Sequence, residues 1–439
     1  MQTDCRGVEF TAKEPRAMAA FDATIEGYLG LAADTGPRLK AVFEADPDMP
    51  MAHVLKGYFF MLMASAPLKA RAAKASAEAD ARMDAATPRE RRHAAALAAW
   101  VRGRHGEAVR SWESILAEHP RDVLALRLSH HGHFYKGDSA NLRAGVERAL
   151  PAWDASVPGF GFVKGMHAFG LEETGAYDAA VAAGKDALAL QSKDPWAIHA
   201  VAHVHEMAGR AKEGLDWIAA NEPGWTGCNN FRYHVWWHRA LMLLARGDTA
   251  AVLALYDRDL WDETSDEYLD LCNDAALLLR LELHGVDVGD RWRALGEKCR
   301  SRTNDRMLAF VDAHFALALA AAKRSEAAEM LDGLAAYAET DEEDNAAVTR
   351  AVGLDLARAM AAYKEGAYGR TVDLLAPVMK DMIRVGGSHA QRDLFTMVLL
   401  DAALRAGRVD LARALADERL SRKPGDAWTV VQRAKAWAI

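Results

Sequence analysis

The chain is poor in cysteine and has no long apolar run. Only four of its 439 residues are cysteines, and no two of them form a C-x-x-C pair. This usage gives no disulfide framework and fits a reducing compartment, so we expect a cytoplasmic protein. The most apolar stretches, near 58–66 and 315–322, are too short to span a bilayer. The first thirty residues also lack the apolar core of a secretory signal.

An excess of positive charge is also absent. The chain has 54 Lys and Arg against 62 Asp and Glu, a formal net charge of −8, without a long basic block. This balance argues against a nucleic acid or an anionic membrane as partner. Proline is scarce, with 13 residues, while 51% of the chain is hydrophobic. Both values suit an array of packed helices.

Glycine, by contrast, recurs with a period. Steps of 34, 38, 34 and 38 residues separate five glycines, each at the end of an expected helix: Gly103, Gly137, Gly175, Gly209 and Gly247. A helix–turn–helix unit that repeats near 34 residues is typical of tetratricopeptide (TPR) repeats. Small residues follow the turns, for example Ala180 and Gly214, where paired helices would touch. The pattern predicts an all-α, TPR-like right-handed superhelix.

Further turns extend this array toward the C-terminus. Gly366 and Gly407 repeat the turn signal, and a degenerate unit is centred near 323–328. We count roughly eight or nine helical hairpins, with irregular spacing between about 257 and 304. Since a solenoid grows by stacking neighbours, we expect cap helices over 1–50 and one continuous domain over 51–439.

Helix starts agree with this register. Asp194 before Pro195 is typical of an N-cap with proline in the first turn. Ser388 and Gln391 have the spacing of a capping box, and Gly386-Gly387 precede them. The glycine pair is either an anion-binding nest or a flexible turn that the cap ends.

The register also predicts which residues face the concave side. In TPR arrays, one stripe of the first helix in each hairpin lines the groove. Histidine and glutamate are concentrated there, although the chain has only 16 histidines. The stripe positions carry Glu90, His93, His131, Phe162, Phe169, Glu172, His199, His203, Glu206, His234 and Trp237.

The densest part of the stripe combines two His-x₃-His pairs. His199, His203 and Glu206 stand at i, i+4 and i+7 on one helix face. His234 and His238 repeat the i, i+4 spacing on the next inner helix. The four imidazoles are candidate ligands of a divalent metal. Without a metal, a histidine beside Glu172 or Glu206 could act as a general base.

Three interpretations of this stripe remain open. It lines a ligand-binding groove without chemistry, it forms an active site, or its histidines are structural and satisfied by neighbours. The order H-E-x-x-H of zinc proteases is absent, because Met207, Ala208 and Gly209 follow His205-Glu206. Spacing alone therefore does not decide between the three.

Several segments of the chain resemble the tetratricopeptide repeat protein 38 family. They are 161–174 (GFVKGMHAFGLEET), 196–207 (WAIHAVAHVHEM), 234–238 (HVWWH) with Leu241, 255–257 (LYD) and 386–393 (GGSHAQRD). The resemblance covers nearly the whole chain and implies a TPR-like superhelix, but no settled activity. It assigns His199, His203, Glu206, His234, His238, Arg392 and Asp393 to the family motif, whereas His205 stands where the motif accepts an aromatic residue.

These observations lead to three functional hypotheses. The first is a binding protein that holds a small molecule or a peptide end; its predicted ligand contacts are Glu172, Trp237, His238, His131, Arg392 and Asp393. The second is a hydrolase-type enzyme that uses His199, His203, His234 and Glu206 in acid–base or metal-assisted catalysis. The third is a protein–protein scaffold. Arg392 is expected to reach the histidine cavity and pair with an acidic ligand group, or else to pair with Asp393 on its own helix. Homo-oligomerisation stays open.

Overall fold

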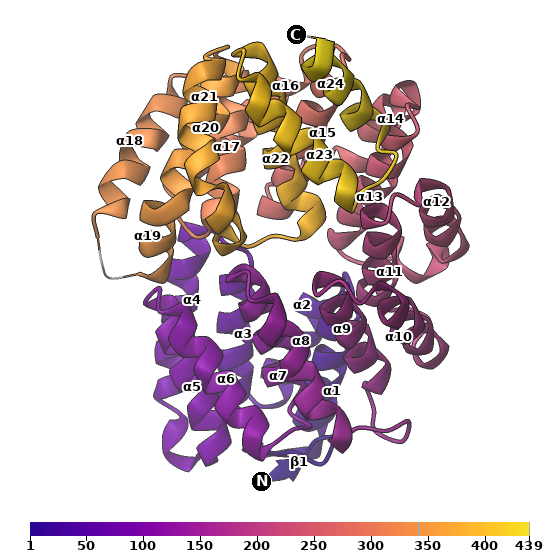
Figure 1. Ribbon diagram of the computed structural model, residues 1–439. Coiled ribbons are helices and arrows are strands. Elements are labelled where there is room, and N and C mark those ends of the chain that lie inside the picture. The colour runs from indigo at the N-terminus through magenta and orange to yellow at the C-terminus, as the bar shows by residue number, and fades with distance from the viewer. Residues whose placement is uncertain (341–342, 439) are drawn as a thin grey trace. The chain divides into compact units, whose positions relative to one another are not determined.

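The computed structural model describes residues 1–340 and 343–438, most of which are helical (Figure 1). In this part of the chain the only sheet is a two-stranded antiparallel ribbon, in which β1 (Gln2–Thr3) pairs with β2 (Glu9–Phe10). The all-α prediction is confirmed. The chain divides into two compact units, which we describe in turn. The cap over 1–50 and the single domain over 51–439 stay predictions.

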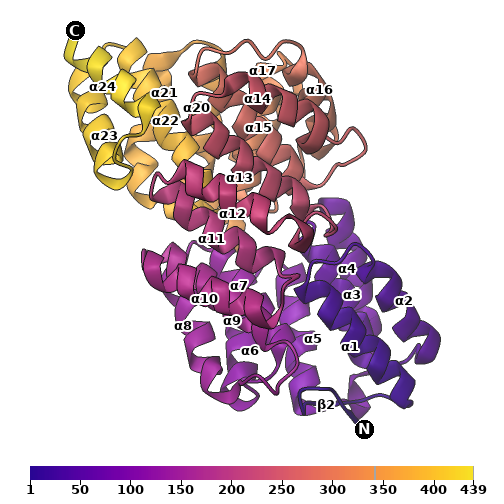
Figure 2. The same cartoon turned by 90° about the vertical axis from the view of Figure 1, so that its right-hand side faces the viewer.

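The first unit contains residues 1–201 and 221–232, with a short segment that ends at Asp344. Its helices follow one another in pairs, and the first helices of successive pairs are in contact, as α3 is with α5 and α7 with α9 (Figure 2). The pairs are α1 (Pro15–Leu29) with α2 (Thr35–Ala45), α3 (Pro50–Leu62) with α4 (Ala66–Asp80), α5 (Pro88–Val101) with α6 (His105–Glu118), α7 (Val123–Tyr135) with α8 (Ser139–Ala149), and α9 (Phe160–Glu173) with α10 (Tyr177–Leu190).

The glycine ladder marks the turns between paired helices, as predicted. All five glycines have a left-handed backbone, with φ between 67° and 80°. A side chain at such a position clashes with the backbone, so glycine is the residue that closes the turn at least cost. Gly366 and Gly407 share this conformation in the later turns, with φ of 76° and 68°.

Other glycines let helices approach each other closely. A Cβ atom added at Gly214 would lie 2.5 Å from the sulfur of Met242, and one at Gly184 would lie 2.4 Å from Val201. Both distances are too short for a real side chain. Toward the paired helix α11, a Cβ atom added at Gly214 would lie 3.0 Å from the Cβ of His205, so the predicted small residue at the hairpin contact is confirmed at Gly214.

The second unit contains the described residues among 202–220, 233–340 and 345–438. It begins within α11 (Pro195–Met207), so this helix contributes to both units. The other helices of the second unit are α12 (Ala211–Ala220), α13 (Phe231–Ala245), α14 (Thr249–Leu255), α15 (Tyr268–Leu283), α16 (Arg291–Cys299), α17 (Ala309–Ala321), α18 (Glu326–Ala338), α19 (Asp344–Val348), α20 (Leu354–Lys364), α21 (Tyr368–Val378), α22 (His389–Arg405), α23 (Val409–Arg422) and α24 (Ala427–Ala438).

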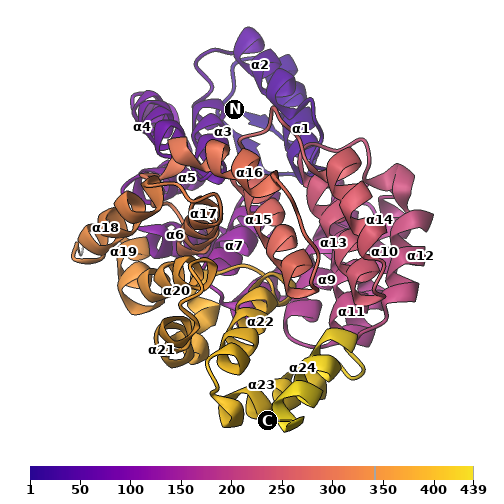
Figure 3. The same ribbon diagram turned by 90° about the horizontal axis from the view of Figure 1, so that it is seen from above.

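The inner helices of the second unit form a closed series of contacts. Helix α15 contacts α17, α17 contacts α20, and α20 contacts α22, while α22 also contacts α15 (Figure 3). Their shared core includes Phe315 of α17 and Phe395 of α22, both fully buried. This closure brings side chains of α22 close to those of α15, although more than a hundred residues separate the two helices.

The stretch with irregular spacing forms regular helix pairs after all. Residues 268–299 form α15 and α16, joined through a left-handed glycine at Gly285. Lys323 takes the same role between α17 and α18, with φ of 55°. A lysine in this conformation carries no glycine signal, which is why the sequence showed a degenerate unit there. Within the described residues, no helix is both long and apolar enough to cross a membrane.

Candidate functional site

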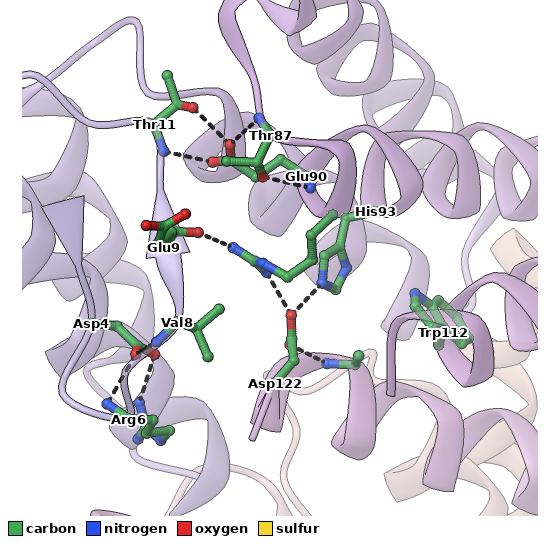
Figure 4. A network of polar contacts seen from close by, with 12 residues as sticks. Asp4, Arg6, Val8, Glu9, Thr11, Thr87, Glu90, His93, Trp112 and Asp122 are labelled. Atoms are coloured by element: carbon green, nitrogen blue, oxygen red, sulfur yellow. Dashed lines mark hydrogen bonds and ion pairs between the residues drawn. The ribbon is translucent and has the colours of Figure 1, made fainter. Parts of the chain in front are cut away.

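Two predicted groove residues, Glu90 and His93, belong to a polar network near the N-terminus (Figure 4). Glu90 completes a capping box with Thr87, and its carboxylate also accepts hydrogen bonds from the backbone N–H and the hydroxyl of Thr11 at 2.9 and 2.7 Å. His93 Nε2 lies 3.0 Å from Asp122 Oδ2, and Arg89 pairs with the same oxygen. The network attaches the ribbon and the start of α7 to α5, which is a structural role.

Electrostatics supports this role. Burial by itself would raise the pKa of Asp122, but the charges of His93 and Arg89 hold it well below the usual range. The side chain of Asp122 also caps α7 by accepting the N–H of Ala125 at 2.9 Å. The buried carboxylate is thus stabilised by several donors at once.

Three histidines of the second unit form a compact cluster, which we call the histidine cluster: His203, His234 and His238. One ring nitrogen from each of them lies within 4.8 Å of the other two. Ring centroids are 4.3 Å apart for His203 and His238, and 4.8 Å apart for His234 and His238. The i, i+4 spacing puts His234 and His238 on one face of α13. The third ring, His203, comes from α11. The side chains of His203 and His238 have no exposed surface.

Two hydrogen bonds orient the imidazoles of α13. Nδ1 of His238 lies 2.7 Å from Oε2 of Glu206, and Nδ1 of His234 lies 3.0 Å from Oδ1 of Asn273 on α15. Both oxygens are acceptors, so each Nδ1 carries the proton and each Nε2 keeps its lone pair. This is the arrangement in which metal-binding histidines are usually held.

Burial keeps the cluster uncharged at neutral pH. It lowers the pKa of His234 and of His238 to about 3, and it lowers the pKa of His203 well below the usual value. Burial also raises the pKa of Glu206. Neutral imidazole is the form that binds a metal and the form that accepts a proton. The cluster is therefore suited to a cation or to a hydrogen-bond donor.

A buried arginine next to the cluster was missed in the sequence. Arg280 of α15 donates to the carbonyl of Ala390 at 2.8 Å and lies over the ring of Trp237, with 5.4 Å to its centroid. Burial lowers its pKa to about 10, so it stays charged. Glu206 and Asp393 are the acids that act on it electrostatically. Arg280 falls in the stretch where the sequence indicated irregular spacing, so its place on a helix face was not predicted.

Trp237, a predicted ligand contact, is fully buried and stacks on His234 with 5.3 Å between ring centroids and 12° between planes. Arg280 lies over the same indole. In this position Trp237 fixes the ring of His234. A contact between Trp237 and a ligand stays a prediction.

Helix α22 brings its motif residues to the same part of the second unit. Arg392 contacts Nδ1 of His389 at 3.4 Å and donates to the carbonyls of Gly386 and Gly387. His389 is close enough to His203 to act on its pKa. The carbonyls of the glycine pair thus face the guanidinium of Arg392, which is a cation. Ser388 and Gln391 form the predicted capping box.

Asp393 pairs with Arg419 of α23, at 2.9 and 2.7 Å. Burial opposes its ionisation, but the charge of Arg419 holds its pKa below the usual range. Asp393 thus has an ion-pair partner on another helix.

The remaining predicted residues lie in the first unit. His199 stacks on Phe169 with 5.5 Å between centroids and meets the edge of Phe231 at 5.1 Å. It stands one turn before His203 on α11, in the part of this helix that belongs to the first unit. Glu172 of α9 is fully buried. The half-buried His131 of α7 has its Nδ1 3.5 Å from the hydroxyl of Tyr28.

Comparison with known proteins adds little to this geometry. No protein-family model matches the chain. One similar solved structure is the crystal structure of the TPR domain of P58(IPK), with 13% sequence identity, 80% of this chain and 98% of that chain covered, and a TM-score of 0.23. A TM-score this low carries no argument, so the helical-repeat fold rests on the helices and turns described above.

Proposed function

We propose that this helical-repeat protein binds a first-row divalent cation at the histidine cluster, and through it the anionic end of a small molecule or peptide. The observation that carries the proposal is the hydrogen bonding of His234 and His238, whose Nδ1 atoms are held by Asn273 and Glu206. Each of the three rings has one nitrogen that lies within 4.8 Å of a nitrogen on the other two. Imidazole nitrogens are good ligands for Zn²⁺ and its neighbours.

The anionic part of the ligand follows from the charges around the cluster. Arg280 and Lys423 both act on the pKa of His238 and lower it, so a cation bound there would meet positive charge. Glu206 offsets part of this repulsion. An anionic co-ligand would offset more of this repulsion, because it could bind the metal and at the same time face Arg280.

The binding proposal is tested by metal titration. We expect the purified protein to bind about one equivalent of Co²⁺ or Zn²⁺ per chain, and to show the absorption of tetrahedral Co²⁺. His203→Ala and His238→Ala should each abolish stoichiometric binding, whereas His205→Ala, on the same helix, should retain it. Circular dichroism at 222 nm confirms that each variant is folded. Equal binding by His203→Ala and wild type, or no binding by wild type, would refute the proposal.

A second candidate function is metal-assisted hydrolysis. In this version the histidine cluster would hold the metal, and one position on the metal would have to stay open for water. In this version Glu206 orients His238 and does not act as the base. Loaded protein that cleaves an activated ester faster than the His203→Ala variant would support it, whereas equal rates would exclude it.

We also propose membership of the tetratricopeptide repeat protein 38 family, on the basis of the histidine–tryptophan segments of α11 and α13. If so, the orienting pair formed by Glu206 and His238 is expected in other members. A collection of related sequences in which these two positions vary independently would count against this assignment.

A further inference from the structure

Another group of buried polar side chains lies entirely within the first unit. Its centre is Arg127 of α7, whose side chain is buried, with the residue 2% exposed. The guanidinium lies over the indole of Trp196, with 4.3 Å to the ring centroid. Stacking of this kind holds the flat face of the group and leaves its N–H edges for hydrogen bonds.

One edge of this guanidinium is buried without a hydrogen-bond partner among the described residues. The nitrogens on this edge are Nε and Nη2 of Arg127. These two nitrogens lie on the same side of the guanidinium and point their N–H bonds in parallel. A carboxylate matches this edge with two parallel hydrogen bonds. Leaving charged donors buried and unpaired costs free energy, so an anionic partner would be strongly favoured.

The nearest acid, Asp194, does not supply this partner. Its Oδ1 accepts the N–H groups of Trp196 and Ala197 at 3.0 and 3.2 Å and so caps α11, as the sequence predicted. Its Oδ2 has no hydrogen-bond partner in the part of the chain that the structure describes. A Cβ atom added at Gly165 would lie 2.3 Å from Oδ2, so α9 packs directly against this oxygen.

The side chains around Arg127 are mostly aromatic. The ring of Trp196 lies 4.8 Å from that of Phe169 and 5.5 Å from that of His131. Nε1 of Trp196 is buried and, within the described residues, lacks a partner, so it offers a third donor. Burial lowers the pKa of His131 well below its usual value, so this ring is neutral. Such surroundings suit an apolar or aromatic body attached to the anionic group.

We propose that Arg127 and Trp196 form a second ligand site, which binds the carboxylate of a small aromatic acid. The site is made of first-unit residues and does not depend on a metal at the histidine cluster. Its one signal in the sequence was spacing, because Arg127 stands four residues before the predicted groove residue His131 and so shares its helix face.

Benzoate is a suitable probe, with benzamide as its uncharged analogue and inorganic phosphate as a second anion. Binding is measured by calorimetry and by quenching of tryptophan fluorescence. We expect wild type to bind benzoate and not benzamide. Arg127→Lys, which keeps the charge but loses the fork, should weaken benzoate binding by about tenfold or more. Arg110→Lys, on the exposed side of α6, should bind as wild type does.

The outcomes separate this proposal from the metal site. Benzoate binding should persist in His203→Ala, since that variant alters only the histidine cluster. Should Arg127→Lys fail to fold, Trp196→Phe removes the Nε1 donor and is expected to weaken benzoate binding several-fold. The proposal is overturned if wild type does not bind benzoate, if it binds benzamide equally well, or if phosphate binds more tightly through Arg127.

Discussion

His238 of α13 and Glu206 of α11 are joined by a hydrogen bond of 2.7 Å between Nδ1 and Oε2. Both residues are buried, and the bond connects two helices that are neighbours in the second unit. It determines which nitrogen of His238 carries the proton. One acidic side chain thus connects the two helices and orients the imidazole of His238.

The first prediction concerns this bond. Glu206→Ala leaves the Nδ1 donor of His238 without its acceptor, so we expect a loss of about 1–3 kcal/mol in unfolding free energy. Affinity for Co²⁺ should fall by about 10- to 100-fold, since the orienting partner is lost. Glu206→Gln keeps an acceptor oxygen, so it should lose less unfolding free energy and less affinity for Co²⁺. Urea denaturation and Co²⁺ titration measure the two effects. Unchanged Co²⁺ affinity in Glu206→Ala would show that Glu206 does not orient the ring.

The second prediction concerns Asp122 in the N-terminal network. Asp122→Ala leaves the buried Arg89 without its partner, so we expect a loss of about 3–5 kcal/mol in unfolding free energy. Asp154→Ala, which removes an exposed carboxylate, is the matched control and should change little. Because the native pKa of Asp122 is depressed, its contribution is present at neutral pH and is lost as the pH falls below about 4. The difference between Asp122→Ala and wild type should therefore shrink in acid. A constant difference between pH 7 and pH 3 would contradict this.

The third prediction concerns Asp194, whose pKa is raised by burial to about 7. The native state then binds a proton that the unfolded state releases near pH 4, so stability should fall as the pH rises from about 4 to 7. Asp194→Asn keeps the capping oxygen and carries no charge. It should be more stable than wild type at pH 8 and close to wild type at pH 4. Thermal unfolding at the two pH values measures this, and an equal shift at both would indicate that ionisation of Asp194 is not the cause.

The fourth prediction compares three glycines. Gly175→Ala puts a side chain on a left-handed turn with open space around it, and should cost about 1–2 kcal/mol. Gly132→Ala should also destabilise, because its Cβ would lie 2.5 Å from Val109. Gly369→Ala, in the first turn of α21 with nothing within 4 Å of the added Cβ, should be neutral or stabilise by up to about 1 kcal/mol. Urea denaturation gives the ranking, and a stabilising Gly175→Ala would show that the turn does not require glycine.

Much of the fold could be predicted because helical repeats are local. A left-handed turn needs glycine within one hairpin, so Gly103 and Gly247 mark their turns without reference to distant residues. Where another residue takes that conformation, as at Lys323, the register was lost. The capping residues Asp194 and Ser388 were identified for the same reason, since a cap depends only on the next three residues.

The site was only partly predictable. Spacing on one helix indicated that His234 and His238 share a face, but not that Asn273 of α15 would orient His234. The stripe also placed Glu90 beside the functional candidates, whereas its carboxylate binds Thr11 in a structural network. Identical residue types at equivalent repeat positions differ in role because their partners come from elsewhere in the chain.

The amino-acid sequence by itself determined the helical hairpins, their turns and the faces on which histidines gather, because each depends on neighbours within one or two helical turns. Only the tertiary structure decided which partners these polar groups have. It packs Glu206 against His238, and among the described residues it leaves one edge of Arg127 without a hydrogen-bond partner. The physical reason is burial: once water is removed, the partner of each polar group must come from a helix that the local sequence does not specify.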